Sequence, residues 1–239
     1  MLKTTNLDYN HQFLYMTYIL HIETSTKVCS VGLSADGVLR QLVETAESGY
    51  VHGEKITLFI QEVLDKEGIR ANQLNAVSVA SGPGSYTGLR IGVSSAKGLC
   101  FALGIPLIAI DSLTCLNELV KDKYKDKTII AMIDARRMEV FSKVFDSISE
   151  SKIEATIIDE ITFEDKIPFI AIGDGVAKLK EFWLRRDIVI DDEIFSSAKG
   201  QVRIAAEKYR MNEFEDLAYF EPFYLKDFVA GISKKNPLS

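Results

Sequence analysis

The residues that could do chemistry in this chain are a glycine-rich stretch at residues 81–92 and a few carboxylates after apolar runs. The stretch reads SGPGSYTGLRIG and joins an expected strand at residues 74–80 to an expected helix at residues 89–103. Glycine tolerates positive φ and lets an anion approach the backbone, and a helix N-terminus adds partial positive charge, which favours phosphate binding. A tight turn without a ligand is the alternative, since the stretch has neither the lysine of a P-loop nor a GxGxxG frame.

A nucleotide held between two lobes would need an acidic residue to organise Mg²⁺ and the phosphates, and Glu23 or Asp134 could serve. The candidates for such a vestigial nucleotide site are Glu23, Thr24, Ser25, Gly82, Gly84, Asp134, Gly173 and Asp174. The loop at residues 23–26 lacks a glycine, however, and Arg136 and Arg137 stand where a glycine is usual. We therefore expect weak or absent nucleotide binding. We interpret Glu23, Asp134 and Asp174 as surface or capping carboxylates at strand ends.

Metal and thiol chemistry are not expected. The three histidines, His11, His21 and His52, have no pair four residues apart and no HExxH pattern, so the sequence predicts neither a metal site nor a protease. Three cysteines without CxxC spacing lie in or beside apolar runs, which indicates reduced core thiols of a cytoplasmic protein. No apolar run approaches the ~20 residues that a bilayer requires, and we expect no contact with membranes.

The elements that must position these residues begin with a β-meander. Residues 18–22, 28–33 and 38–42 are short apolar runs separated by polar loops, one of which carries Asp-Gly. Apolar residues at i, i+3, i+4, i+7 and i+8 then predict an amphipathic helix at residues 52–67, closed by Gly68. A strand, the glycine-rich turn, the helix at residues 89–103, a strand at residues 106–110 and a helix from residue 111 complete the first half.

The second half repeats the first in outline. Strands are expected at residues 128–133, 138–145, 152–158 and 169–172, followed by a short helical run. We therefore predict an α/β protein of two ribonuclease-H-like lobes, as in actin-like ATPases and sugar kinases, each a mixed sheet of βββαβα type with flanking helices. The expected boundaries are an N-terminal extension (1–15), a first lobe (16–120), a connector (121–127), a second lobe (128–228) and a disordered tail (229–239).

Charge and surface chemistry narrow the function. The net charge of −6 argues against a protein that grips nucleic acid alone, so any role on RNA would depend on a basic partner. The helix at residues 89–103 carries only Arg90 and Lys97 as charges among many small residues, so a second helix or another protein could pack closely against it. Complete burial of this helix within its own lobe is the alternative.

The glycine-rich sequence also carries a resemblance to a known family. Together with IETST at residues 22–26, DARR at residues 134–137 and PFYL at residues 222–225, the string GPGSYTGLRIG resembles the bacterial tRNA threonylcarbamoyladenosine (t6A) biosynthesis proteins of the TsaB, or YeaZ, family. The likeness runs from residue 16 to about residue 228 and is most specific in the first half. It implies a two-lobed actin-like fold and a role in modifying adenosine 37 of tRNAs that read codons beginning with A.

The resemblance also implies a non-catalytic subunit with no cofactor of its own, beyond weak or vestigial ATP and Mg²⁺ binding in the complex. Its expected partners are the catalytic paralogue TsaD and the ATPase TsaE, with tRNA reached only through the complex. In the family, the two helices equivalent to residues 52–67 and 89–103 pack against the equivalent two helices of the paralogue. They can also pack against their own copies in a homodimer. The residues predicted for this interface are Ile56, Phe59, Ile60, Val63, Arg90, Gly92, Ser95, Ala96 and Leu99. An actin-like nucleotide enzyme, active on its own as an ATPase or kinase, remains the alternative.

Overall fold

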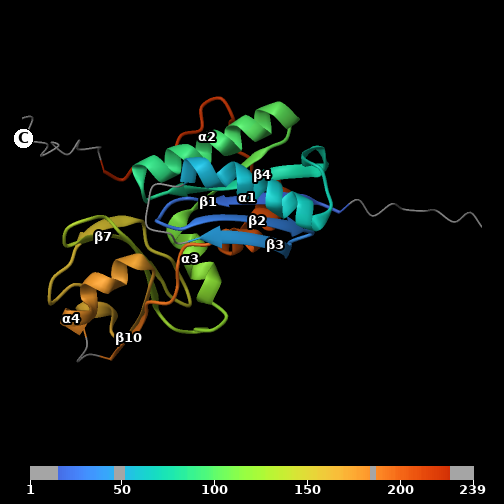
Figure 1. The fold of residues 1–239 in the computed structure, drawn as a ribbon. Coiled ribbons are helices and arrows are strands. Elements are labelled where there is room, and N and C mark those ends of the chain that lie inside the picture. The colour runs from blue at the N-terminus through green and yellow to red at the C-terminus, as the bar shows by residue number, and fades with distance from the viewer. Residues whose placement is uncertain (1–15, 46–51, 184–186, 227–239) are drawn as a thin grey trace, which may run out of the picture.

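The computed structural model describes residues 16–45, 52–183 and 187–226, which form two five-stranded sheets flanked by helices (Figure 1). The first sheet contains β1 (Tyr18–Glu23), β2 (Cys29–Ala35), β3 (Val38–Thr45), β4 (Leu74–Gly82) and β5 (Leu107–Asp111). Its strand order is β3-β2-β1-β4-β5. The three strands β1 to β3 are antiparallel to one another, whereas β4 pairs in parallel with both β1 and β5.

The second sheet repeats this topology. Its strands are β6 (Ile129–Asp134), β7 (Glu139–Phe145), β8 (Glu154–Ile157), β9 (Phe169–Ile172) and β10 (Ile188–Asp191). The strand order β10-β9-β6-β7-β8 is that of the first sheet, with β6 in the place of β1, and the parallel and antiparallel pairings also correspond. The prediction of two ribonuclease-H-like lobes is confirmed.

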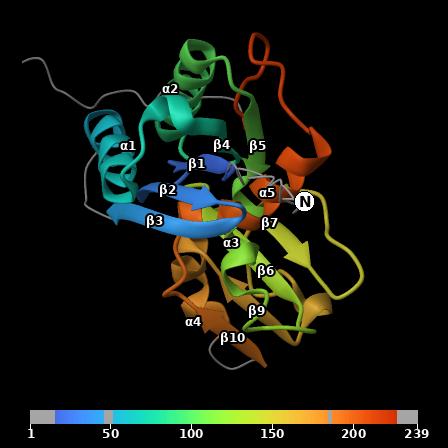
Figure 2. The ribbon, with the colours of Figure 1, turned by 90° about the vertical axis from the view of Figure 1, so that its right-hand side faces the viewer.

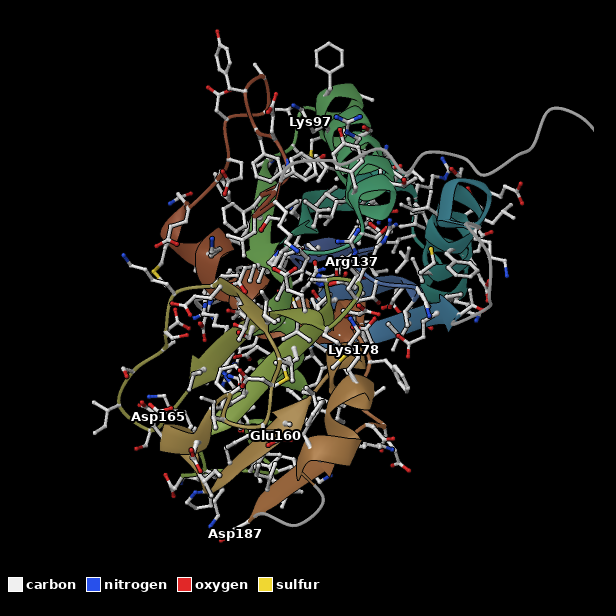
Figure 3. All side chains as sticks on the ribbon, turned by 90° about the vertical axis from the view of Figure 1, so that its left-hand side faces the viewer. Lys97, Arg137, Glu160, Asp165, Lys178 and Asp187 are labelled. Carbon is white, nitrogen blue, oxygen red and sulfur yellow. The ribbon has the colours of Figure 1, made fainter. Side chains whose placement is uncertain are left out.

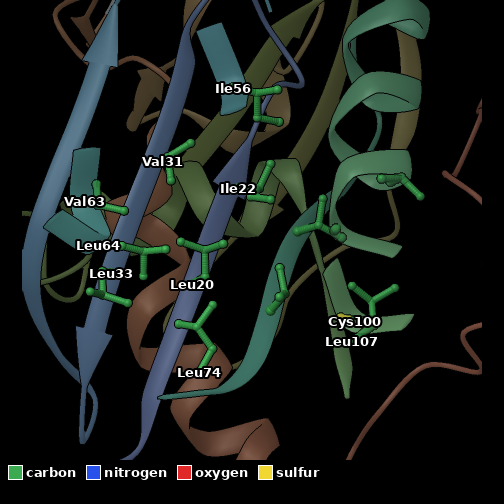
Figure 4. Packing of buried hydrophobic residues seen from close by; sticks show 14 of the residues in the cluster. Leu20, Ile22, Val31, Leu33, Ile56, Val63, Leu64, Leu74, Cys100 and Leu107 are labelled. Atoms are coloured by element: carbon green, nitrogen blue, oxygen red, sulfur yellow. The ribbon is translucent and has the colours of Figure 1, made fainter. Parts of the chain in front are cut away.

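Helices cover the two faces of the first sheet. The helices α1 (His52–Glu67) and α2 (Tyr86–Leu103) lie on one face, and α3 (Ser112–Val120) and α5 (Val202–Met211) lie on the other (Figure 2). The apolar stripe of α1 explains its place, because Ile56, Val63 and Leu64 pack on Leu20, Val31 and Leu33 of the sheet (Figure 4).

The two lobes share the layer between their sheets. One side of α3 packs on the second sheet through Leu113, Leu116 and Val120, while Cys115 belongs to the core beneath the first sheet. A 3₁₀ segment (Asp174–Leu179) and the short α4 (Lys180–Trp183) lie on the outer face of the second sheet. Among the described residues, every helix is too short or too polar to span a bilayer.

The end of the described chain returns to the first lobe. Residues 198–226 follow the second sheet in sequence and fall within the predicted second lobe, yet α5 packs on the first sheet and the backbone N–H of Glu215 donates to Leu107 O at 2.9 Å. Leu217 and Phe220 join the first core. The apolar residues of α5 are therefore buried against the first sheet, which is distant in sequence. A lobe boundary predicted from local sequence does not reveal this packing.

Helix α1 and the strands of the first half have nearly the predicted bounds, and α2 begins three residues earlier than predicted. The second half departs from the prediction at two places. A three-residue 3₁₀ turn (Glu164–Lys166) stands between β8 and β9 instead of a helix, and the strand β10 was not predicted. The predicted extension (1–15) and tail (229–239) lie outside the described residues.

Candidate functional site

The glycine-rich turn is filled by the chain itself. A Cβ on Gly84 would lie 2.2 Å from the carbonyl oxygen of Ser25, and the backbone N–H of Ser85 donates to that same oxygen at 2.6 Å. A Cβ at Gly92 would lie 2.2 Å from Thr24 Oγ1, which donates to Gly88 O at 2.8 Å. These two glycines therefore admit the loop at residues 23–26, and an approaching phosphate would find its place taken by Ser25 O.

Gly82 serves a second close approach. Its φ is +107°, and a Cβ there would lie 2.6 Å from Phe223 O. The backbone N–H of Phe223 donates to Ser81 O at 2.7 Å. The returning segment thus packs directly on the strand end that precedes the turn. Ser85 caps α2 by accepting from the N–H of Gly88 at 3.2 Å.

The acid at the end of β1 is buried. Glu23 accepts from the backbone N–H of Ser25 at 2.7 Å through Oε1, while its Oε2 has no hydrogen-bond partner. Burial raises the pKa of Glu23, and the hydrogen bonds oppose that shift. Glu23, Thr24 and Ser25 are each fully buried, so this loop offers no accessible ligand for a Mg²⁺ ion in the described conformation.

Beside Glu23 runs a buried chain of hydrogen bonds that joins the first sheet to the returning segment. Ser78 Oγ donates to Gln201 Oε1 at 2.6 Å and therefore accepts from His21 Nδ1 at 2.7 Å. His21 Nε2 then accepts from Ser34 Oγ at 2.8 Å. Burial lowers the pKa of His21 to about 3, so the ring is neutral. Gln201 Nε2 completes the chain by donating to Ile22 O at 2.8 Å.

The two acids of the second lobe lie together at the junction between the lobes. Asp174 Oδ1 accepts from the backbone N–H of Asp134 at 2.9 Å, and Asp134 forms an ion pair with Lys178. Burial and the charge of Asp134 raise the pKa of Asp174 above its ordinary value. The positive charge of Lys27 in the first lobe partly opposes this rise. Gly173 admits the carbonyl oxygen of Met132. The eight predicted residues thus form two clusters, each satisfied chiefly by the protein's own groups.

The predicted interface residues divide into two classes. Ile56, Val63, Gly92 and Ala96 are buried against the first sheet or its loop. They are not available to a partner while the lobe is folded, and the prediction is corrected for these four because they form the inner stripes of α1 and α2. Phe59, Ile60 and Leu99 are partly buried, Ser95 is half-buried and Arg90 is exposed.

The outward face of these helices has residues that the sequence reasoning missed. Leu58 is 66% exposed and Phe101 is 83% exposed. Ser94, Gly98 and Ala102 are also exposed on α2, and a Cβ on Gly98 would meet no atom within 4 Å. We call these five residues the outer helix face. Continuing the helical period outward from the buried stripe would have found them.

Arg90 and Lys97 are held by the returning segment. Arg90 Nε donates to Tyr224 Oη at 3.3 Å, and its guanidinium lies 4.1 Å from the centre of the Tyr86 ring. Lys97 Nζ donates to Phe220 O at 2.8 Å and Ala218 O at 3.3 Å. Both charges border the outer helix face, because Arg90 and Lys97 lie one helical turn before Ser94 and Phe101, and their hydrogen bonds hold them against the returning segment.

Within the described ranges, no three His, Cys, Asp or Glu side chains gather in a way that could hold a metal ion. The cysteines Cys29, Cys100 and Cys115 are buried free thiols, and burial raises the pKa of each.

Comparison with known proteins gives three findings. Residues 46–234 match the family model described as TsaD, tRNA N6-adenosine threonylcarbamoyltransferase. The tRNA threonylcarbamoyladenosine biosynthesis protein TsaB of Haemophilus influenzae is 26% identical over 228 residues, which cover 88% of this chain and 94% of that protein. The TsaB protein of Buchnera aphidicola from Acyrthosiphon pisum is 32% identical over 165 residues, covering 69% of this chain and 72% of that protein.

Two further matches bear on fold and paralogy. The solved structure of YeaZ from Pseudomonas aeruginosa has a TM-score of 0.70 at 24% identity and covers 88% of this chain and all of that one. A tRNA N6-adenosine threonylcarbamoyltransferase of Geobacillus thermodenitrificans is 34% identical over 108 residues, which are 39% of this chain and 32% of that enzyme. Part of the chain is thus similar to the transferase, and most of it is similar to a two-lobed protein of known structure.

Proposed function

Since this chain belongs to the TsaB family of tRNA threonylcarbamoyladenosine biosynthesis proteins, we propose that it is the non-catalytic subunit that supports threonylcarbamoyl transfer to adenosine 37 of tRNA. In this role it binds a catalytic TsaD protein, and the ATPase TsaE joins the pair. It acts in the cytoplasm and reaches tRNA as part of the complex.

The observation that carries this proposal is the outer helix face. Leu58 on α1 and Phe101 on α2 are large apolar side chains that are more than half exposed, and α2 also exposes small residues that allow a second helix to approach closely. The outer face lies on the side of the first sheet away from the second lobe, so a partner can reach it without moving either lobe (Figure 2). A partner that carries an equivalent helix pair would complete a four-helix packing.

The similarity to a transferase supplies that partner. Because a TsaD relative is 34% identical over 108 residues of this chain, the two proteins share a stretch long enough to contain a strand and both helices. Similar helix pairs that meet face to face form a pseudo-symmetric interface, and two copies of this chain could use the same face as a homodimer.

The filled loops support a subunit without its own nucleotide chemistry. Ser25 O occupies the position above the glycine-rich turn, and Glu23 is buried beneath it. ATP would have to displace both before its phosphates could reach the backbone N–H groups of the turn. The alternative, an actin-like enzyme active alone, therefore requires a rearrangement of the first loop.

The test is threonylcarbamoylation of tRNA by a purified TsaD protein, TsaE and threonylcarbamoyl-AMP, with and without this chain. We expect activity only when the chain is present and none from the chain alone. Hydrolysis of ATP or transfer by the chain alone would instead favour the enzyme alternative, and Glu23→Gln and Asp134→Asn would then be the variants to assay.

Charged variants of the outer helix face sharpen this test. Gly98→Glu and Phe101→Glu place a charge where the partner would bury it, so we expect loss of complex formation and of activity, with unchanged folding. Met211→Glu is the matched control, because Met211 is 61% exposed on α5, away from the face. Normal assembly of the two outer-face variants in gel filtration would refute this interface.

A further inference from the structure

The turn between β6 and β7 presents two arginines in an unusual backbone conformation. Arg136 and Arg137 have φ values of +69° and +51°, the left-handed region that glycine and asparagine adopt most readily. Asp134 Oδ1 accepts from the backbone N–H of Arg136 at 2.6 Å, and Arg136 O accepts from that of Glu139 at 3.3 Å, which fixes the turn. Both side chains are exposed, and neither makes an ion pair within the described ranges.

The first lobe also has a cation near this junction. Lys27 is exposed in the loop that follows β1 and lies close enough to Asp174 to lower the pKa of that carboxyl. Asp174 in turn accepts from the backbone of Asp134, which accepts from that of Arg136. The cations Lys27, Arg136 and Arg137 therefore border one junction between the lobes. We call them the junction cations.

Arg137 and Lys178 lie on the side of the second lobe toward the first lobe, whereas Glu160, Asp165 and Asp187 lie toward its opposite end (Figure 3). The junction also contains Asp134 and Asp174, but Asp134 is paired with Lys178 and Asp174 accepts a backbone hydrogen bond, which leaves the arginines, among the described residues of this lobe, as its exposed unpaired charges. A chain with a net charge of −6 repels polyanions on most of its surface, so a polyanion would be attracted chiefly at the junction.

An enclosed nucleotide does not fit this place. Lys178 is already paired with Asp134, and Ser25 O blocks the glycine-rich turn across the junction, so a mononucleotide would lack a phosphate cradle. Exposed guanidinium groups on a turn instead suit the phosphates of an extended backbone, which they bind in bidentate fashion without enclosing a base.

We propose that the junction cations contact the phosphate backbone of tRNA. The identity of the RNA rests on the function proposed above; the anion site itself rests only on the residues described. The contact positions the substrate and contributes no sequence specificity, because it reaches phosphates alone.

The first experiment measures binding of fluorescent tRNA to the isolated chain by anisotropy, over a salt series that begins at low ionic strength. Arg136→Gln with Arg137→Gln should weaken binding at least about fivefold and lower the slope of log K against log salt by about one for each arginine. The charge-matched control is Lys125→Gln with Lys127→Gln, in the exposed connector at the other end of β6, and it should change affinity less than about twofold.

A second variant separates binding from folding. Arg136→Asn with Arg137→Gly suits the left-handed backbone, so it should unfold at an equal or higher temperature while losing the same tRNA affinity. The same series is measured with the chain assembled with a TsaD protein. No detectable binding by the unmodified chain in either form at low salt, or an unchanged affinity and salt slope in both arginine variants, would overturn the proposal.

The complete transferase reaction distinguishes this proposal from the function on which it rests. With assembled complex, the arginine variants should raise KM for tRNA and leave kcat and complex formation unchanged. If the chain binds tRNA through these arginines but the reaction does not need the chain, the proposed function fails and the anion site stands. If the reaction needs the chain but the arginine variants bind tRNA with unchanged affinity, only the proposed anion site is refuted.

Discussion

The two lobes share a strand order but differ in the helices that follow their strands. In the first lobe, β3 leads to β4 through the 16-residue α1, and β4 leads to β5 through the 18-residue α2. In the second, a three-residue 3₁₀ turn joins β8 to β9, and the four-residue α4 lies between β9 and β10. The two lobes thus share the topology of their sheets. Among the described residues, long helices with an exposed outer face cover the sheet of the first lobe but not that of the second.

The first strands of the two lobes also end differently. Counting back from the strand ends, Glu23 corresponds to Asp134 and His21 to Met132. Glu23 is buried without a cation on its second oxygen, while the Asp134 side chain is 40% exposed and paired with Lys178. The end of β1 thus lies in a buried polar network, whereas the end of β6 lies at the surface, where charge can meet a ligand.

The largest change in stability should come from Gly84, where the glycine-rich turn contacts the loop at residues 23–26. Gly84→Ala would bring a methyl group within 2.2 Å of a backbone oxygen, so we expect a loss of roughly 3 kcal/mol in unfolding free energy. In the second lobe, a Cβ on Gly175 would lie 3.0 Å from Met132 Cβ and Val140 Cγ1, so Gly175→Ala needs smaller shifts and should lose only about 1 kcal/mol. Urea denaturation measures both, and equal losses would contradict the larger cost assigned to the approach of the Ser25 backbone oxygen to Gly84.

The network that joins the first sheet to the returning segment gives the next effect. Gln201→Leu removes the donor to Ile22 O and the acceptor for Ser78 Oγ, and leaves both groups buried, so it should lower stability by roughly 2 kcal/mol. The control is Gln61→Leu, which removes an exposed hydrogen bond to Asp65 and should change stability by less than about 0.5 kcal/mol. Similar denaturation midpoints for the two variants would contradict a structural role for this network.

The neutral His21 should make folding depend on pH. Its pKa in the folded chain is about 3 and its ordinary value is 6.5, so the unfolded chain binds the proton more readily between these values. Stability from this group is complete above pH 6.5 and falls as the pH drops toward 3, by up to about 1.4 kcal/mol per pH unit. The raised pKa of Glu23 acts in the opposite direction, because its folded form keeps a proton that the unfolded form releases.

His21→Gln isolates the histidine contribution. We expect the variant to be less stable at pH 7 and to lose less stability than the parent between pH 6.5 and 4. Denaturation at a series of pH values measures this difference. Parallel curves for the two proteins would show that His21 does not titrate on unfolding.

Local patterns predicted what local contacts determine. The i, i+3, i+4 spacing predicted α1 with its observed bounds, and apolar runs predicted every strand of the two sheets except β10. The role of Gly84 depends on Ser25, far away in sequence, so a glycine that admits a phosphate and one that admits a neighbouring loop look the same in the chain. The packing of residues 198–226 on the first sheet likewise depends on contacts between residues far apart in sequence, among them those of Leu107 and Phe220.

The smallest effect has the opposite sign and tests the outer helix face without adding charge. Gly98 lies within α2 with open space around it, so Gly98→Ala should stabilise the isolated chain by roughly 0.5–1 kcal/mol through helix propensity. If a partner helix approaches there, the added methyl group should weaken assembly even as it stabilises the monomer, whereas Ser94→Ala, which removes one exposed oxygen, should leave assembly nearly unchanged. Denaturation and titration calorimetry with the partner measure the two effects separately. A stabilised monomer with unaltered assembly would move the contact away from Gly98 and toward the Leu58 side of the face, because only a close approach of backbones is sensitive to a single methyl group.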